Sequence, residues 1–152
     1  MTEKALTIYT DGGCHGNPGP GGWAYVMVHE HQITECYGSA WDTTNNRMEL
    51  LAVIEALRAG STLVGTDEVI DLHTDSQYVR NGITQWIHTW IRNGWRTAAK
   101  KPVKNQDLWQ ELHSIETQLK VHWNWVKGHA GNVHNERCDV LVQKAIAEME
   151  KK

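Results

Sequence analysis

The sequence is poor in cysteine and has no long hydrophobic run. Its 152 residues include three cysteines, an odd number without the close pairs of a zinc site, which favours reduced thiols over disulfides. No apolar run approaches the roughly 20 residues that a membrane-spanning helix needs. The start, MTEKALTIYTDGG, lacks an apolar region ahead of a cleavage site. We therefore expect an unprocessed, soluble, cytoplasmic chain with no membrane association.

Acidic residues are missing from one long stretch of the chain. Between Ser76 and Gln106 there is no Asp or Glu, whereas six cations occur there, namely Arg80, Arg92, Arg96, Lys100, Lys101 and Lys104. Because the whole chain carries a net charge of -3 and this stretch carries +6, the rest of the chain carries a net charge of -9. A basic segment suits phosphate groups, and an acidic remainder suits a metal site. The alternative for this window is an ordinary solvated charged surface.

The length and the 40% hydrophobic content fit one compact domain, and the alternation of strands and helices along the chain predicts an α/β fold. Alternating apolar residues predict a first strand from Leu6 that ends at Asp11. WAYVMVHE and ITECYGSA predict two further strands of an antiparallel meander, joined by a turn near residues 29–32. Short strands are also expected at residues 69–72 and 121–126. The pattern predicts a mixed five-stranded sheet, with three antiparallel and two parallel strands, flanked by helices.

Two helices are indicated by apolar spacing. Leu50, Val53, Ile54 and Leu57 share one helical face, with Thr44 as the expected N-cap and Gly60 as the expected end. The connection from residue 60 to residue 68 is then expected to be a long surface loop. Cys138, Leu141, Val142 and Ala145 indicate a C-terminal helix.

Four short motifs each contain an acid: TDGGCHGNPGPGG, TNNRMEL, TDSQYV and VKGHAGNVHNERCD, with Asp11, Glu49, Asp75 and Asp139. Asp11 and Asp75 follow strands that we expect to be parallel, so they should emerge side by side. Carboxylates gathered in this way repel one another unless a divalent cation lies between them. Singly, each acid has an ordinary explanation as a turn residue, a helix-start charge or a surface partner of Arg137 or Lys144. Together they predict a paired-metal phosphodiesterase.

These motifs, in this order and over nearly the whole chain, resemble bacterial-type ribonuclease H type 1. The segment from Asp75 to Trp109 resembles the basic helical handle of that family, here at about residues 84–105 of a single domain spanning residues 1–152. The resemblance implies a ribonuclease H-like fold and an endonuclease that hydrolyses the RNA strand of RNA/DNA hybrids with little sequence specificity. It also implies two Mg2+ ions, with Mn2+ as a substitute, and products with 5′-phosphate and 3′-hydroxyl ends. A monomer is expected.

The resemblance also implies roles for individual residues. Asp11, Glu49 and Asp75 would hold the main metal site, Asp139 would complete the second, and His129 would shuttle a proton. Residues expected along the RNA strand are Gly12, Cys14, Asn17, Glu49 and Gln77, and Asn46 is expected at base edges in the minor groove. For the DNA strand, Trp86 and Trp109 would pack on deoxyribose, and Thr44, Asn45 and Arg47 would grip a phosphate. Arg92 and Asn105 are further expected contacts with the substrate.

The handle departs from its more basic relatives. Outside the handle, Gly13 replaces the usual serine after Asp-Gly, which affects a small local contact but no metal ligand. In the handle, Ile91 and Asn93 stand where a lysine and an arginine are familiar. We therefore expect weaker hybrid affinity and a shallower salt dependence than in those relatives. Two other functions remain open at this point. One is a catalytically silent hybrid-binding module, and the other is a different metal-dependent nuclease or strand transferase built on the same sheet.

Overall fold

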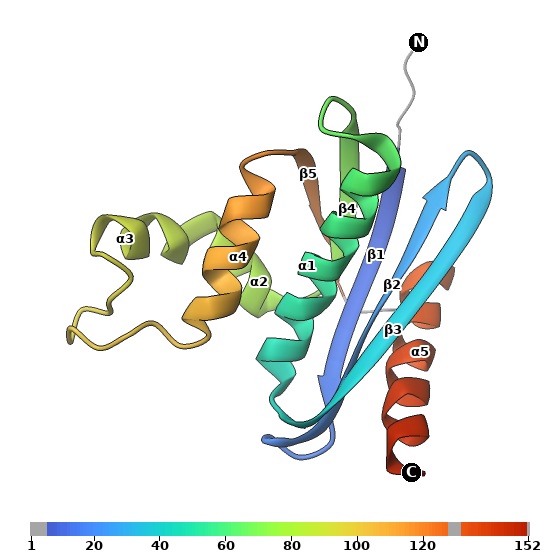
Figure 1. Ribbon diagram of the computed structural model, residues 1–152, viewed down its shortest axis with the longest axis horizontal. Coiled ribbons are helices and arrows are strands. Elements are labelled where there is room, and N and C mark those ends of the chain that lie inside the picture. The colour runs from blue at the N-terminus through green and yellow to red at the C-terminus, as the bar shows by residue number, and fades with distance from the viewer. Residues whose placement is uncertain (1–5, 128–131, 152) are drawn as a thin grey trace.

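A five-stranded mixed sheet forms the centre of the molecule (Figure 1). The structure is a computed structural model that describes residues 6–127 and 132–151. The strand order is β3-β2-β1-β4-β5, with β1, β2 and β3 antiparallel and with β4 and β5 parallel to β1. The predicted α/β fold and sheet composition are confirmed. The strands are β1 (Leu6–Cys14), β2 (Gly19–His29), β3 (Gln32–Thr43), β4 (Val69–Thr74) and β5 (Lys120–Trp125).

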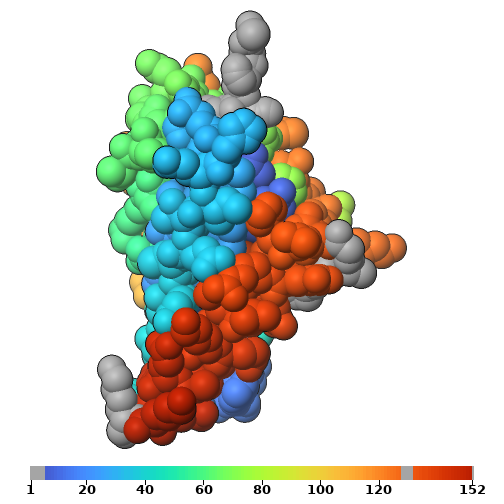
Figure 2. Space-filling view, turned by 90° about the vertical axis from the view of Figure 1, so that its right-hand side faces the viewer, coloured from blue at the N-terminus to red at the C-terminus, as the bar shows by residue number. Residues whose placement is uncertain are grey.

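Helices cover both faces of this sheet. Helices α1 and α4 pack together on one side, and α5 lies on the other side against β1, β2 and β3 (Figure 2). Among the described residues, no helix is both long and apolar enough to cross a bilayer. The helical elements are α1 (Asn45–Val64), α2 (Gln77–Asn81), the π-helical segment η1 (Gly82–Trp86), α3 (Ile87–Arg92), α4 (Gln106–Glu116) and α5 (Val133–Glu150).

Alternation along the central strands divides the core into two layers. Side chains of successive strand residues point to opposite faces of a sheet. On β2, Tyr25 and Met27 therefore join the larger core with α1 and α4. Ala24 and Val26 join the smaller core under α5. Burial on both faces fixes the strand register, because a shift by one residue would exchange the two sets.

Helix α1 begins where the sequence predicts and ends later. The Thr44 side chain accepts a hydrogen bond from the backbone N–H of Arg47, which confirms the N-cap. The predicted end at Gly60 is wrong, because Gly60 is a buried packing position. A Cβ there would lie 3.0–3.2 Å from the tips of Leu6, Ile8 and Ile70. The helix continues to Val64, and Gly65 ends it with φ 78°, so the connection to β4 is shorter than expected.

The basic handle projects from one side of the molecule (Figure 1). Its helical part consists of η1 and α3, and residues 93–105 have no helix, with an isolated antiparallel bridge between Arg96 and Pro102. Trp90 and Trp95 pack against the larger core, as expected. The cations at positions 92, 96, 100, 101 and 104 are all exposed. The apolar side of the handle therefore attaches it to the body, and its charges face solvent.

Candidate active site

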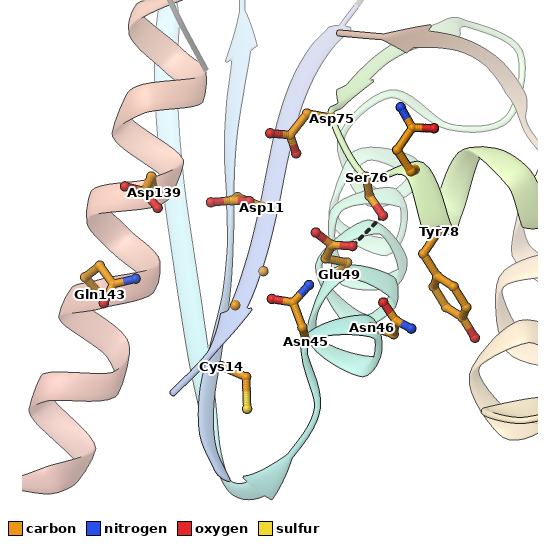
Figure 3. Close-up of a pocket in the computed structure, with 13 residues that line it drawn as sticks. Asp11, Cys14, Asn45, Asn46, Glu49, Asp75, Ser76, Tyr78, Asp139 and Gln143 are labelled. Carbon is orange, nitrogen blue, oxygen red and sulfur yellow. Dashed lines mark hydrogen bonds between the residues drawn. The ribbon is translucent and has the colours of Figure 1, made fainter. Parts of the chain in front are cut away.

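Three of the four predicted acids meet at one end of β1 and β4. Asp11, Glu49 and Asp75 each offer a carboxylate oxygen, and these oxygens all lie within 4.8 Å of one another (Figure 3). The parallel register pairs Tyr9 with His73, so Asp11 and Asp75 stand at equivalent positions two residues further on. Asp11 does not mark the exit of β1 as predicted, because β2 pairs with β1 as far as Cys14. The side-by-side placement of the two aspartates nevertheless follows from the predicted parallel strands.

Close backbone contact brings Glu49 to this pair. A Cβ on Gly12 would lie 2.4–2.6 Å from backbone atoms of Met48 and Glu49, so only glycine permits this approach of β1 to α1. The Ser76 hydroxyl donates a hydrogen bond of 2.5 Å to Glu49 Oε1. The same Ser76 oxygen accepts from the Val79 backbone N–H, which caps α2. The start of α2 and the start of α1 are thus joined through the Glu49 carboxylate.

Asp139 enters from the other side of the sheet. It lies in the second turn of α5 and is exposed, and it lines the same open cavity of about 650 Å³ as the three clustered acids (Figure 3). Its carboxylate is not part of the 4.8 Å cluster. The cavity is lined by Asp11, Gly12, Gly13, Cys14, Asn45, Asn46, Glu49, Asp75, Ser76, Gln77, Tyr78, Asp139 and Gln143.

The donor set fits a divalent cation. Mg2+ binds hard oxygen ligands at about 2.1 Å, so two oxygens on one ion lie at most about 4.2 Å apart. The separation of 4.8 Å or less among the three carboxylates is within a small side-chain rotation of that geometry. Asp11 is only 8% exposed, so its charge is poorly compensated by water. A cation among Asp11, Glu49 and Asp75, with Asp139 in reach of the same cavity, would balance these charges.

The thiols near the site are held in their protonated form. Burial, followed by the negative charge of Asp11, raises the pKa of Cys138. Burial also raises the pKa of Cys14, whose thiol donates to the carbonyls of Gly19 and Thr43 at 3.4 and 3.3 Å. Cys14 therefore ties the glycine-rich turn to the end of β3, and its sulfur is a structural donor.

Arg47, which is expected to grip a phosphate with Thr44 and Asn45, is already hydrogen-bonded to two neighbouring side chains. The Arg47 guanidinium donates to both carboxylate oxygens of Asp107, at 3.0 and 2.8 Å, and to Asn105 Oδ1 at 3.1 Å. This pair raises the pKa of Arg47 and lowers that of Asp107. Nearby, Asn17 Oδ1 accepts from the Asn45 backbone N–H at 3.1 Å, which joins the glycine-rich turn to the start of α1. The two groups flank Thr44, the N-cap of α1.

The predicted aromatic contacts divide into one surface side chain and one core side chain. Trp86 is half-buried on the handle. Trp109 is fully buried, so the expectation that its indole packs on deoxyribose is wrong for this structure. Its Nε1–H donates to the Tyr78 hydroxyl at 3.0 Å, and that hydroxyl also accepts from Asn105 Nδ2 at 3.0 Å. Trp109 therefore contributes to the site indirectly, by holding the hydroxyl of Tyr78, which lines the cavity.

Several residues of the site were not predicted from the sequence. Ser76, Tyr78 and Gln143 line the cavity without having been assigned a role. A Ser directly after a strand and before a helix is an N-cap signal that indicates Ser76. Gln143 follows Asp139 by four residues, which places both on one helical face. His129 lies outside the described residues. The remaining predicted contacts, Gly12, Asn46 and Gln77, line the cavity, and Arg92 is exposed on the handle.

Comparison with known proteins identifies the family. The RNase H family model matches residues 3–147. A curated Ribonuclease H of Chelativorans sp. (strain BNC1) is 55% identical over 149 residues, covering 98% of this chain and 90% of the relative. The Ribonuclease H of Caulobacter sp. (strain K31) is 54% identical, covering 94% of this chain and 90% of the relative.

Solved structures agree with this assignment. LC9-RNase H1, described as a type 1 RNase H with the type 2 active-site motif, is 34% identical with a TM-score of 0.83, over 97% of this chain and 74% of that one. LC11-RNase H1, solved in complex with RNA/DNA hybrid, is 23% identical with a TM-score of 0.72, over 95% of this chain and 99% of that one, and shows the shared fold. The chain belongs to the bacterial-type ribonuclease H type 1 family of nucleases.

Proposed function

We propose that this protein hydrolyses the RNA strand of RNA/DNA hybrids by a mechanism that uses two divalent metal ions, Mg2+ in the first instance. The observation that carries the proposal is the meeting of the Asp11, Glu49 and Asp75 carboxylates within 4.8 Å in an open cavity. Family membership supports it, as does the fold shared with a relative solved in complex with RNA/DNA hybrid. The expected products carry 5′-phosphate and 3′-hydroxyl ends.

The four acids have distinct parts in this mechanism. Asp11, Glu49 and Asp75 would hold the ions on the sheet side of the cavity, and Asp139 would complete the coordination from α5. When bound, the divalent ions would supply the charge that activates the attacking water and stabilises the leaving 3′ oxygen. Ser76 holds the Glu49 carboxylate in place by donating its hydroxyl proton. His129 would move a proton to or from the reacting oxygens.

The glycine-rich turn and the start of α1 offer a path for the RNA strand. Gly12 and Cys14 line the cavity beside the acids, and Gln77 lines it from α2. Close approach of backbone groups to the 2′-hydroxyl is how a protein distinguishes RNA from DNA at one site. Asn46 would read base edges in the minor groove, and Asn17 would extend the contact along the strand.

The DNA strand would follow the handle and the group around Arg47. Asp107 and Asn105 hold the Arg47 guanidinium in one orientation, beside the Thr44 N-cap. A planar guanidinium can bind a phosphate through two parallel hydrogen bonds, so a pre-oriented Arg47 loses little side-chain entropy on binding. Asn45 would share that phosphate, Trp86 would pack on deoxyribose, and Arg92 would add a charge contact.

The remaining expectations extend this proposal to the whole chain. Residues 1–152 would act as one ribonuclease H domain with its handle, as a cytoplasmic monomer. Because two cations of more basic handles are replaced by Ile91 and Asn93, hybrid affinity would be weaker and would fall less steeply with salt.

The direct test is cleavage of end-labelled substrates with Mg2+ or with chelator. RNA/DNA hybrid, duplex RNA, duplex DNA and single-stranded RNA would be compared for wild type, Asp11→Asn and the control Asp67→Asn, an exposed acid in the connection before β4. We expect cutting only of the RNA in the hybrid, lost with chelator and with Asp11→Asn and retained by Asp67→Asn. Hybrid binding without cutting by wild type would favour a silent binding module, and cutting of duplex DNA would indicate a different nuclease.

A further inference from the structure

Helix α5, which carries Asp139, rests on the sheet mainly through apolar side chains. Cys138, Leu141, Val142 and Ile146 pack against Ala24 and Val26 of β2, and Figure 2 shows α5 lying across this face. Apolar contact is non-directional and depends on buried area. One hydrogen bond adds direction to this face, because the Cys138 thiol donates to the Tyr9 carbonyl oxygen at 3.3 Å. A thiol is a weak donor, so we expect the position of Asp139 along the helix axis to depend also on stronger directional contacts.

Directional contacts flank Asp139 on both sides. Two residues before it, Arg137 donates from Nε and Nη2 to the two carboxylate oxygens of Glu35 on β3, at 2.7 and 2.9 Å. Four residues after it, Gln143 is 2.9 Å from a ring nitrogen of His15 in the turn after β1. The Arg137 contact is bidentate and charge-assisted, and it reaches a strand, so it is the stronger constraint on the helix.

The charges and the exposure of Glu35 and Arg137 indicate that the two side chains interact with each other and do not serve to fill the core. The Arg137 guanidinium holds the pKa of Glu35 below its usual range. The side chains of Arg137 and Glu35 are 43% and 33% exposed, so neither is needed to fill the core. Further along α5, Tyr37 of β3 donates to Glu148 at 2.9 Å, which anchors the distal end of the helix. Loss of the Glu35 contact would leave α5 folded and docked, with its Asp139 end less fixed.

We propose that Glu35 and Arg137 are a positioning pair that holds Asp139 at the cavity and thereby sets the affinity for the divalent cation that Asp139 helps to bind. This inference rests on the proposed function, because it gives Asp139 a metal to bind. Neither residue contacts the reacting groups, and both act through the placement of α5. Partners that hydrogen-bond directly to a metal ligand typically change metal affinity by about 10- to 100-fold, so this more remote pair should change it by about three- to tenfold.

The test is a Mn2+ titration of the full chain, followed by calorimetry and by the Mn2+ resonance signal, without nucleic acid. The variants are Glu35→Gln, Asp139→Asn and the combination of the two. We expect Glu35→Gln to weaken Mn2+ binding about three- to tenfold and to cause no further loss in the Asp139→Asn background. In cleavage assays the same variant should need more metal for half-maximal rate, with KM for the hybrid unchanged.

Two further variants separate positioning from general loosening of α5. The charge-exchanged pair, Glu35→Arg with Arg137→Glu, should recover most of the lost Mn2+ affinity. Tyr37→Phe, which removes only the hydrogen bond to Glu148 at the distal end, should bind Mn2+ like wild type.

Unchanged Mn2+ affinity in Glu35→Gln would overturn the inference, and so would an equal loss in both backgrounds, because the pair would then not act through Asp139. Asp139-independent Mn2+ binding by wild type would also overturn it. Wild type that binds Mn2+ through Asp139 but cuts no hybrid would instead refute the proposed function.

Discussion

A methyl group added at Gly82 tests how the handle is held on the body. Gly82 begins η1 and is buried. A Cβ at this position would lie 1.9 Å from Cη2 and 2.4 Å from Cζ2 of Trp109. The Trp109 ring is fully buried and packs between Tyr78 and Trp90, with ring centroids 5.4 and 5.5 Å away. The indole is rigid, so it has no free direction in which to move.

The size of the effect follows from these distances. Carbon atoms that are not bonded pack at about 3.5–4.0 Å, so the new methyl group and the ring must separate by roughly 1.6 Å or more. Overpacking of this kind costs about 1–3 kcal/mol. Displacing Trp109 also breaks its hydrogen bond to Tyr78, worth about 1 kcal/mol, whereas alanine gains up to about 1 kcal/mol in helix propensity. We expect Gly82→Ala to lower the free energy of unfolding by about 1–4 kcal/mol.

Urea unfolding of wild type, Gly82→Ala and Gly60→Ala would measure this difference. Gly60 is the matched control, because it is also a buried helical glycine, but its Cβ would meet only the flexible tips of aliphatic side chains at 3.0–3.2 Å. Its substitution should change stability by less than about 1 kcal/mol. A Gly82→Ala protein as stable as wild type, with an unchanged denaturant slope, would refute the argument, because helix propensity would then outweigh the steric clash.

Three further predictions follow from charge and burial. Two unit charges 4.8 Å apart repel by about 3 kcal/mol at an effective dielectric constant of about 20, so Asp11→Asn should stabilise the metal-free protein by about 1–2 kcal/mol and reduce the thermal shift produced by Mg2+. Cys138 should react with thiol reagents only after unfolding, because it is buried with a raised pKa, and mass spectrometry after labelling would show this. Arg47 lowers the pKa of Asp107, so this pair stabilises the fold fully above the ordinary carboxyl pKa near 4. The stabilisation is lost as the pH falls through the lowered pKa of Asp107. Acid unfolding, monitored by circular dichroism, should therefore be less steep for Asp107→Asn.

The acids and the elements that carry them could be predicted because local rules decide them. Strand alternation places Asp11 and Asp75, and the cap at Thr44 places Glu49 in the first turns of α1. The strands and the cap depend on residues close together in the chain, and the side-by-side placement of the two aspartates follows from the parallel pairing of β1 with β4. The family motifs predict that the four acids belong to one metal site, which no single acid could indicate.

The predictions that failed depend on contacts between distant residues. Glycine is common at the ends of helices, which is why the sequence predicts that Gly60 ends α1. Its actual role is to leave room for the side chains of Leu6 and Ile70, which pack against it across the core. A tryptophan next to a basic segment is a reasonable candidate for contact with nucleic acid. Trp109 is instead buried and packs directly against Gly82. No local pattern distinguishes a glycine that ends a helix from one that admits a neighbour, because the difference lies in what packs there.

The site is therefore built from two parts with different mechanical support. Asp11, Glu49 and Asp75 are joined by strand pairing, by the close contact at Gly12 and by the Ser76 hydrogen bond, so a change in one of these elements moves the others with it. Asp139 reaches the cavity on a helix docked by apolar contact and a few directional side chains. Because apolar docking tolerates small shifts that a strand ladder does not, substitutions on the sheet face of α5 should change metal occupancy while the three clustered acids keep their geometry.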